Sequence, residues 1–307
     1  MAVRVLPALP RETAAPVLRS VRQALVVGST GNATNVALES AFAGGGLDAY
    51  VVEPERLAGL VEPGDLVLSR VDVHPSLDGP CAGLWETAAA ERAGATLLNR
   101  PTPLYLAHDK LATATVLAEA GVPHPRTVHL AVAGAPARVA TPCVVKPRFG
   151  SWGRDVFLCR DREELRRALR EVAARGWFLA HGALVQERVG TGRADLCVLV
   201  AAGAVVGAVR RVAGPGEWRT NVAAGGRRAP AAPGPEAARL AVRAVSALRL
   251  DFAGVDLIRD DAGRWVVLEV NGAVDFTEEY ALDGTSVYQE VVRRLAAALP
   301  FLMCKRG

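Results

Sequence analysis

The sequence predicts a mixed α/β protein with two or three subdomains. Residues 21–105 alternate between strand and helix patterns, an alternation typical of a mainly parallel sheet. After residue 143 the pattern changes to short strands joined by turns, with a glycine-rich loop between the first two. Near the C-terminus, two β-rich runs flank a polar turn at 259–264, which predicts a hairpin. A chain of 307 residues, half of them hydrophobic, is long enough to bury a core in each part.

The elements of the N-terminal third are predicted from apolar runs bounded by turn residues. The first run ends in Gly28-Ser-Thr-Gly31, a glycine turn of the kind that joins a strand to a helix. With Glu53 as a ribose ligand, this turn is consistent with a dinucleotide-binding fold, but it is equally consistent with a purely structural crossover. We expect strands over 21–27, 49–53, 65–69 and 95–98, and helices over 35–44 and 84–93.

The rest of the chain is predicted to contain more strands than helices. A helix over 107–120 is expected to stop at Gly121 and Pro123. A glycine- and proline-rich stretch covers 213–235, and long loops of this kind in compact domains are often functional. The remaining strands are expected over 143–146, 156–159, 184–187, 195–201 and 204–210, and the remaining helices over 162–174, 236–248 and 286–298.

Composition argues against several classes of protein. No apolar run approaches the roughly 18 residues of a membrane span, and the first 16 residues are too proline-rich for a signal peptide. The five cysteines are scattered and lack a CxxC pair, so we expect reduced thiols and a cytoplasmic location. The 36 basic residues are nearly all arginines that do not alternate with aromatic residues, which gives nucleic-acid binding little support. Neither HExxH nor GxSxG is present.

The predicted C-terminal hairpin carries two carboxylates and an amide. With a turn at 260–263, Asp256 would face Val267, and Glu269 would be its diagonal neighbour on the same face, together with Asn271. Three oxygen donors on one face of apolar strands suit a hard cation such as Mg²⁺ that also binds phosphates. The alternative is a polar sheet face exposed to solvent.

A lysine before the glycine-rich loop predicts contacts with phosphate. The chain has only three lysines, Lys110, Lys146 and Lys305, and Lys146 ends an apolar strand just before glycines 150 and 153. Such a lysine supplies positive charge, and the glycines let backbone N–H groups approach an anion. The loop lacks the GxxxxGK[ST] pattern and so is not a Walker A loop. An ordinary hairpin with a surface lysine is the alternative.

These motifs, taken in order over about residues 95–295, resemble the ATP-grasp ligases, and most nearly the RimK/LysX type. Each match is weak alone, but the order and spacing of the set are specific. The matching segments are Asn99-Arg-Pro, His108-Asp-Lys110, Gly121-Val-Pro-His-Pro-Arg126, Val145-Lys146-Pro, Phe149-Gly-Ser-Trp-Gly-Arg154, Val185-Gln-Glu187, Arg210-Arg211, Trp218-Arg-Thr-Asn221, Gly254-Val-Asp256, Glu269-Val-Asn271 and Asp275-Phe276.

The resemblance implies an ATP-grasp fold preceded by a Rossmann-like domain. The N-terminal α/β domain would cover 1–105, a central subdomain with the glycine-rich loop 106–185, and a C-terminal subdomain with the metal site 186–307. The implied cofactors are ATP and Mg²⁺, with Mn²⁺ as a possible substitute. The expected partners are an amino-acid substrate and a small acidic carrier protein or a peptide, and a homo-oligomer is expected.

The resemblance also implies roles for single residues. Gln186 and Glu187 would lie at the adenine edge and Asp195 near the ribose or adenine. Arg211 and Asn221 would be catalytic, facing the γ-phosphate and the acyl phosphate, and Asp256, Glu269 and Asn271 would hold Mg²⁺. The full set implied to contact ATP is Lys110, Lys146, Gly150, Ser151, Trp152, Gly153, Gln186, Glu187, Asp195, Arg211, Arg219 and Asn221.

The implied activity is that of a carboxylate–amine ligase acting through an acyl phosphate. A natural-product or peptide-tailoring amide ligase, and a nucleotide-binding protein that has lost ligation, are the alternatives; an oxidoreductase has no support after residue 106. Two arginines of the family pattern are replaced here, at Cys197 and Ala224, although Arg227 and Arg228 follow. The second change counts against the substrate of the lysine pathway and leaves the implied binding of ATP and Mg²⁺ intact. Residues 70–78 also do not follow the family pattern, and they are candidates to contact the acceptor or the substrate.

Overall fold

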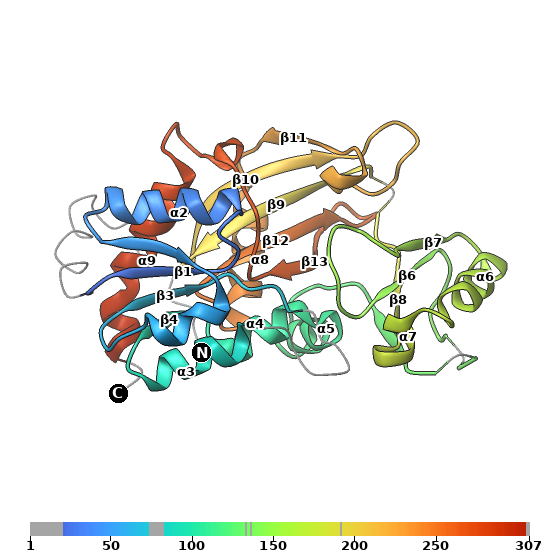
Figure 1. Ribbon diagram of the computed structural model, residues 1–307. Helices are drawn as coiled ribbons and strands as arrows, with labels where there is room; N and C mark the ends of the chain where they lie inside the picture. The colour runs from blue at the N-terminus through green and yellow to red at the C-terminus, as the bar shows by residue number, and fades with distance from the viewer. Residues whose placement is uncertain (1–20, 74–82, 133, 136, 191, 305–307) are drawn as a thin grey trace.

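The computed structural model describes residues 21–304 apart from 74–82 and the single positions 133, 136 and 191. The first twenty residues, Lys305 and most of the segment 70–78 therefore lie outside the described part of the chain. Three sheets follow one another along the sequence, and Figure 1 shows the second at one end of the molecule and the third beside the first. This mixed α/β architecture confirms the predicted fold class.

The first sheet is fully parallel, with the strand order β2-β1-β3-β4. Helix α2 begins where the Asn32 side chain accepts a hydrogen bond from Asn35 N, and the chain then returns to the sheet, as the alternating pattern predicted. The elements are β1 (Ala24–Val27), α2 (Ala33–Gly44), β2 (Ala49–Val52), the 3₁₀ helix η1 (Pro54–Gly59), β3 (Leu66–Ser69), α3 (Leu84–Arg92) and β4 (Thr96–Leu98).

The glycine turn after β1 is held by contacts within the protein. Glu53 accepts hydrogen bonds from Thr30 N at 2.7 Å and from Thr30 Oγ1 at 2.8 Å, so its carboxylate closes the turn. A Cβ at Gly28 would lie 2.7 Å from the carbonyl oxygen of Arg70. The backbone of the neighbouring segment therefore comes so close that only a glycine fits at this position. These contacts favour the structural interpretation of the turn.

The predicted single helix over 107–120 is in fact two helices, α4 (Pro101–His108) and α5 (Lys110–Glu119). They are separated by Asp109, whose backbone is extended at φ −86° and ψ 99°. Its carboxylate accepts hydrogen bonds from Leu111 N and Ala112 N, so it caps the second helix. The break places Lys110 at the first turn of α5.

The second sheet is antiparallel, in the order β5-β8-β6-β7. Two of its elements, β5 and α7, were not predicted, because each is too short to show a clear periodicity. Helices α6 and α7 lie beside this sheet, away from the rest of the molecule (Figure 1). The elements are β5 (Thr127–Leu130), β6 (Cys143–Pro147), β7 (Phe157–Cys159), α6 (Arg162–Val172), α7 (Gly176–His181) and β8 (Ala183–Glu187).

The third sheet has five antiparallel strands in the order β11-β10-β9-β12-β13. Its edge strand β11 lies in the glycine- and proline-rich stretch that we expected to be a loop. The elements are β9 (Ala194–Ala201), β10 (Ala204–Val212), η2 (Val222–Ala224), β11 (Arg227–Pro230), α8 (Pro235–Ala247), β12 (Phe252–Arg259), β13 (Trp265–Asn271), η3 (Glu278–Tyr280) and α9 (Val287–Cys304).

The register of the β12–β13 hairpin differs from the prediction. Asp256 pairs directly with Glu269, whereas Leu257 pairs with Val267, so Leu268 is an extra residue in a β-bulge. The prediction that Asp256 faces Val267 is therefore wrong. The shared face was predicted correctly, because a directly opposite residue points the same way as a diagonal one.

The first and third sheets share one hydrophobic core. Val26 and Leu98 of the first sheet are fully buried in the same cluster as Leu199 and Phe252 of the third. The division at residues 105 and 185 stays a prediction, and its second boundary falls inside β8. Among the described residues, no helix has the length and apolarity to cross a membrane.

Candidate active site

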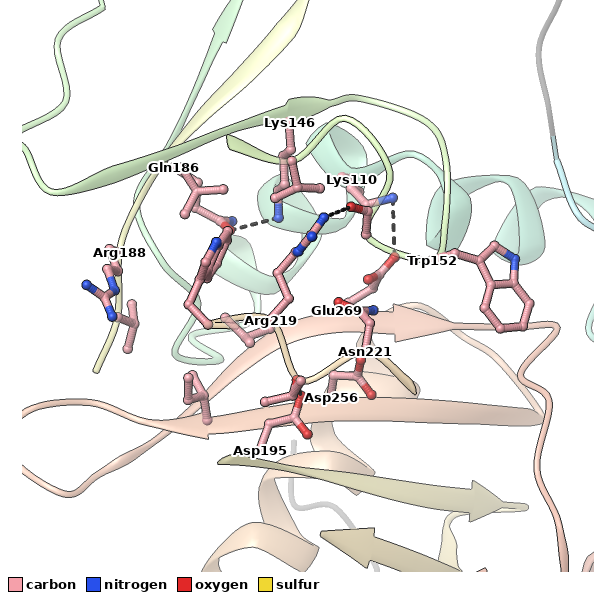
Figure 2. Close-up of a pocket in the computed structure, with 18 of the residues that line it drawn as sticks. Lys110, Lys146, Trp152, Gln186, Arg188, Asp195, Arg219, Asn221, Asp256 and Glu269 are labelled. Carbon is pink, nitrogen blue, oxygen red and sulfur yellow. Dashed lines mark hydrogen bonds and ion pairs between the residues drawn. The ribbon is translucent and has the colours of Figure 1, made fainter. Parts of the chain in front are cut away.

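A cleft lies between the second and third sheets, with about 1150 Å³ of empty space when open solvent at its mouth is included. Figure 2 shows Lys146 and Gln186 on one side of it and Asp195 and Asp256 on the other. One predicted metal ligand, Asn271, lines an adjoining cavity instead. The predicted site residues that line the cleft are Lys110, Lys146, Gly150, Ser151, Trp152, Gly153, Gln186, Glu187, Asp195, Arg211, Arg219, Asn221, Asp256 and Glu269.

Lys146 points into the cleft from the end of β6. Its Nζ donates a 2.8 Å hydrogen bond to Oε1 of Gln186, and Gln186 in turn donates to Thr127. Burial lowers the pKa of Lys146 to about 8, and Lys110 adds to this effect while Glu269 opposes it. An anion in the cleft would favour the charged form of this lysine.

Lys110 joins the two walls of the cleft. Its Nζ lies 3.3 Å from Oε1 of Glu269 and donates a hydrogen bond to the carbonyl oxygen of Gly150. Burial alone would raise the pKa of Glu269, but Lys110 and Lys146 outweigh it and hold that pKa below its ordinary value. The Glu269 carboxylate is therefore kept charged.

The glycine-rich loop between β6 and β7 touches the opposite wall. Arg219 donates from Nη1 to the carbonyl oxygen of Gly153 at 2.9 Å and from Nη2 to Glu217 at 2.8 Å. Gly153 has φ +67°, and a Cβ there would lie 2.8 Å from Oδ1 of Asn221. The loop therefore comes this close only because residue 153 has no side chain. Trp152 also has positive φ, at 63°, and leaves 54% of its surface exposed.

Arg211 is held between two carboxylates. It donates to Asp195 from Nε at 2.8 Å and from Nη2 at 2.6 Å, and Nη2 lies 2.7 Å from Oδ2 of Asp256. Burial opposes its charge, but Asp256 and Asp195 outweigh burial and raise the pKa of Arg211. Asp195 also accepts a hydrogen bond from Thr220, so both of its carboxylate oxygens are engaged within the protein. The structure thus gives Asp195 the position of a support for Arg211.

The two carboxylates of the hairpin fit a divalent cation in their chemistry. Asp256 and Glu269 are directly opposite on neighbouring strands, and Asn271 lies two residues further on the same face. Burial raises the pKa of Asp256, although Arg211 opposes the shift. A bound cation would reverse this effect by favouring the ionised carboxylate.

The three predicted metal ligands already have partners within the protein, which the sequence did not reveal. Lys110 and Arg211 already compensate the two carboxylates, and Asn271 accepts a hydrogen bond from Ala273 N. Within the described residues, no group of three or more His, Cys, Asp or Glu side chains could hold a metal ion. The set therefore suits an ion that takes its remaining ligands from phosphate oxygens and water.

A second cavity, with about 1400 Å³ of empty space when open solvent is included, adjoins the cleft at these carboxylates. It is lined mainly by the start of α2, the five strands of the third sheet and the segment that follows β13, with Asp72 beyond the end of β3. Six residues line both cavities: Ser151, Trp152, Arg211, Asn221, Asp256 and Glu269.

Sequence reasoning missed several residues of the site. Arg188 and Thr220 line the first cavity, and Tyr280 and Arg228 line the second. Asp109 binds Arg148 from the adjacent loop, although its place between His108 and Lys110 in a quoted motif could have drawn attention to it. Arg228 follows the family arginine that is replaced at Ala224, and this position was a signal that the sequence offered. Tyr280 had none, because its neighbours in the cavity come from distant parts of the chain.

Comparisons with known proteins agree with this architecture. Residues 107–295 match the model of the RimK-like ATP-grasp domain. A probable alpha-L-glutamate ligase of Xanthomonas campestris is 33% identical over 212 residues, which cover 66% of this chain and 69% of that protein. A glutamate–LysW ligase ArgX of Sulfurisphaera tokodaii is 28% identical over 68% of this chain and 76% of its own length.

Solved structures share the fold at lower identity. The ATP-grasp ligase PsnB, solved with minimal precursor, Mg and ADP, has a TM-score of 0.63 at 20% identity and covers 92% of this chain and 98% of its own. The D-alanine–D-alanine ligase of Bacillus anthracis, solved with ATP, has a TM-score of 0.66 at 16% identity and covers 94% and 99%.

The chain belongs to the RimK-like ATP-grasp family. It is an ATP-grasp ligase, an enzyme that forms amide bonds at the expense of ATP.

Proposed function

We propose that this enzyme joins the amino group of an amino acid to a carboxyl group of a carrier protein, a peptide or a small molecule. A carboxylate oxygen attacks the γ-phosphorus of ATP, which yields an acyl phosphate and releases ADP. The amine then attacks the acyl carbon, phosphate leaves, and the amine loses a proton. Without this activation the carboxylate would have to expel oxide, which is a very poor leaving group.

The observation that carries this proposal is the junction of the two cavities. The six residues that line both include Arg211, Asp256 and Glu269, so positive charge and metal-type ligands lie where the contents of the cavities would meet. Phosphoryl transfer depends mainly on positioning and on charge stabilisation, and this junction offers both. ATP in the first cavity would direct its γ-phosphate toward an acceptor in the second.

The residues of the first cavity fit the parts of ATP. Lys110 and Lys146 supply positive charge for the phosphates, and the loop at Gly150–Gly153 covers them with backbone N–H groups. Mg²⁺, held by Asp256, Glu269 and Asn271, would neutralise charge on the transferring phosphoryl group. Contact between the loop and Arg219 would restrict the access of water to the acyl phosphate.

The names of the relatives and structural neighbours guide the choice of partners. One relative is named for glutamate and the protein LysW, and the structural neighbour PsnB was solved with a precursor. Both support an amino-acid amine and a protein or peptide carboxyl group as the substrates here. A homo-oligomeric state and a cytoplasmic location remain predictions.

Hydroxylamine provides the test. The enzyme is incubated with ATP, Mg²⁺, hydroxylamine and a panel of free amino acids, N-acetylated amino acids and short peptides as acyl donors. A true ligase forms a hydroxamate from at least one donor, because hydroxylamine intercepts the acyl phosphate. A protein that binds ATP tightly but forms no hydroxamate with any donor would instead fit the alternative of a nucleotide-binding protein without ligation.

A further inference from the structure

We infer that Arg228 binds the free carboxylate of the amino acid whose amino group is joined, and so selects amino acids over simple amines. The inference rests on the proposed function. Arg228 lies on the edge strand β11 and lines the second cavity, while the neighbouring Arg227 lines neither cavity. The sequence showed Arg227 and Arg228 after the replaced family arginine at Ala224 but did not assign a role to either.

The sheet places Arg228 next to the predicted catalytic arginine. Arg211 is directly opposite Asp195 in the β9–β10 pair and directly opposite Arg228 in the β10–β11 pair. The three side chains therefore form one row on the same face of the sheet. Like charges directly opposite each other on neighbouring strands are destabilising, so the two arginines require nearby anions.

The two arginines differ in how far that requirement is met. Arg211 has hydrogen bonds or ion pairs with two carboxylates, Asp195 and Asp256. Arg228 has one ion pair, a 3.2 Å contact from its Nε to Glu279, a side chain that is 50% exposed. Its two Nη groups have no hydrogen-bond partner among the described residues. A guanidinium with a free edge is suited to bind a carboxylate through two parallel hydrogen bonds.

The charges of the second cavity also fit an amino acid. Arg211 and Arg228 are the only basic side chains among the described residues that line it, and Arg211 is already engaged. Four carboxylates line the rest: Asp72, Asp256, Glu269 and Asp275. Asp256, Glu269 and Asp275 already pair with Arg211, Lys110 and Arg70, so Arg228 is the cation left in this cavity to bind the carboxylate of an amino acid.

The spacing connects binding to the reaction. Neighbouring strands lie about 5 Å apart. A group bound by Arg228 is therefore separated by about one strand spacing from a group bound by Arg211. The amino and carboxylate groups of an α-amino acid are attached to the same carbon. An amino acid anchored at Arg228 can therefore direct its amine toward an acyl phosphate beside Arg211, whereas a simple amine has no such anchor.

Binding to the full chain loaded with Mg²⁺ and the ATP analogue AMPPNP tests this inference. Calorimetry compares the twenty amino acids with their C-terminal amides, which lack the carboxylate. We expect at least one amino acid to bind about tenfold or more tighter than its amide. In Arg228→Gln that preference should disappear, and in Arg227→Gln, the matched change at the next residue on the opposite face, it should remain.

A further variant separates recognition from simple structural damage. Glu279→Gln removes the carboxylate that competes for Arg228, so the amino acid should bind at least as tightly as in the wild type. The inference is overturned if no amino acid binds the loaded wild type, or if Arg228→Gln keeps the preference over the amide. Hydroxamate formation by the wild type is measured separately, because hydroxylamine has no carboxylate. Its absence counts against the proposed function, and its presence without the Arg228 effect counts against this inference alone.

Discussion

At the scale of single residues, the site is a set of opposite charges that compensate one another. Lys110 pairs with Glu269 and Arg211 with Asp256, and each pair joins residues far apart in the sequence. The lysines and carboxylates could be selected from the sequence, because lysines are rare in this chain and the carboxylates interrupt apolar strands. Their pairing could not, since it depends on how α5 packs beside β13 and on the order of the strands in the third sheet.

Lys146 provides a direct test of phosphate binding. We expect Lys146→Ala to weaken the affinity for AMPPNP about 10- to 150-fold, because a charge-assisted phosphate contact contributes about 1.5–3 kcal/mol. Arg167→Ala, which removes an equal charge from the exposed face of α6, should leave the affinity unchanged. Equal affinities of the two variants in calorimetry would rule out the phosphate role of Lys146.

The lowered pKa of Lys146 also predicts a pH dependence of stability. The folded protein without nucleotide releases this proton near pH 8, whereas an unfolded lysine keeps it up to its ordinary pKa of 10.5. Between these values the unfolded state binds more protons, so the contribution of Lys146 to stability rises with pH. In urea titrations at pH 7.5 and 9.5, the wild type should gain stability relative to Lys146→Met as pH rises. A constant difference between the two proteins would contradict the burial of this ammonium group.

At the scale of elements, two local irregularities shape the site. The bulge at Leu268 sets Asp256 directly opposite Glu269, and the break at Asp109 places Lys110 at the start of a helix. The sequence predicted the hairpin, the shared face of its polar residues and the loop beside Lys146. It did not predict the bulge, because an extra residue leaves the apolar pattern of the strand intact. It did not predict β11 either, because glycines and prolines surround that short strand.

A substitution in the glycine-rich loop tests whether the contact between the two walls of the cleft matters for the reaction. We expect Gly153→Ala to lower the rate of hydroxamate formation about tenfold or more, since the new Cβ would clash with Asn221 and a positive φ disfavours alanine. Gly192→Ala changes another glycine of the same cleft, which has room for a Cβ and should retain the rate. A wild-type rate in Gly153→Ala, with both variants folded by thermal melting, would show that close approach of the loop is unnecessary.

At the scale of the whole molecule, the first and third sheets are joined by one buried asparagine as well as by their shared core. Asn99 donates to the carbonyl oxygens of Phe252 and Gly272 and accepts from the backbone N–H groups of Asp251 and Phe252. Residues of both parts line the second cavity, among them Asn32 and Asp72 from the N-terminal part and Arg211 and Asp256 from the third sheet. The sequence placed Asn99 in a family motif but gave no sign of this role.

Replacing that amide tests the junction. We expect Asn99→Asp to lower the free energy of unfolding by about 3 kcal/mol or more, because it replaces the amide N–H donors with a charged oxygen that faces two carbonyl oxygens in a buried place. The same amide-to-acid change at the exposed Gln289 of α9, Gln289→Glu, should have an effect within about 0.5 kcal/mol. Urea unfolding measures both, and equal small effects would mean that Asn99 does not join the sheets.

The central claim, activation of a carboxylate as an acyl phosphate, is tested most directly by the nucleotide product. With an acyl donor and hydroxylamine, we predict ADP and hydroxamate in a ratio near one to one, because Arg211 and the carboxylates that would hold Mg²⁺ lie at the junction where the γ-phosphoryl group would be transferred. Asp256→Asn should stay folded and lose this turnover at least about a hundredfold, since a lost metal ligand removes several kcal/mol of charge stabilisation. Chromatography of the nucleotides decides the question: ADP as the product agrees with the acyl-phosphate mechanism, and AMP with pyrophosphate would contradict it.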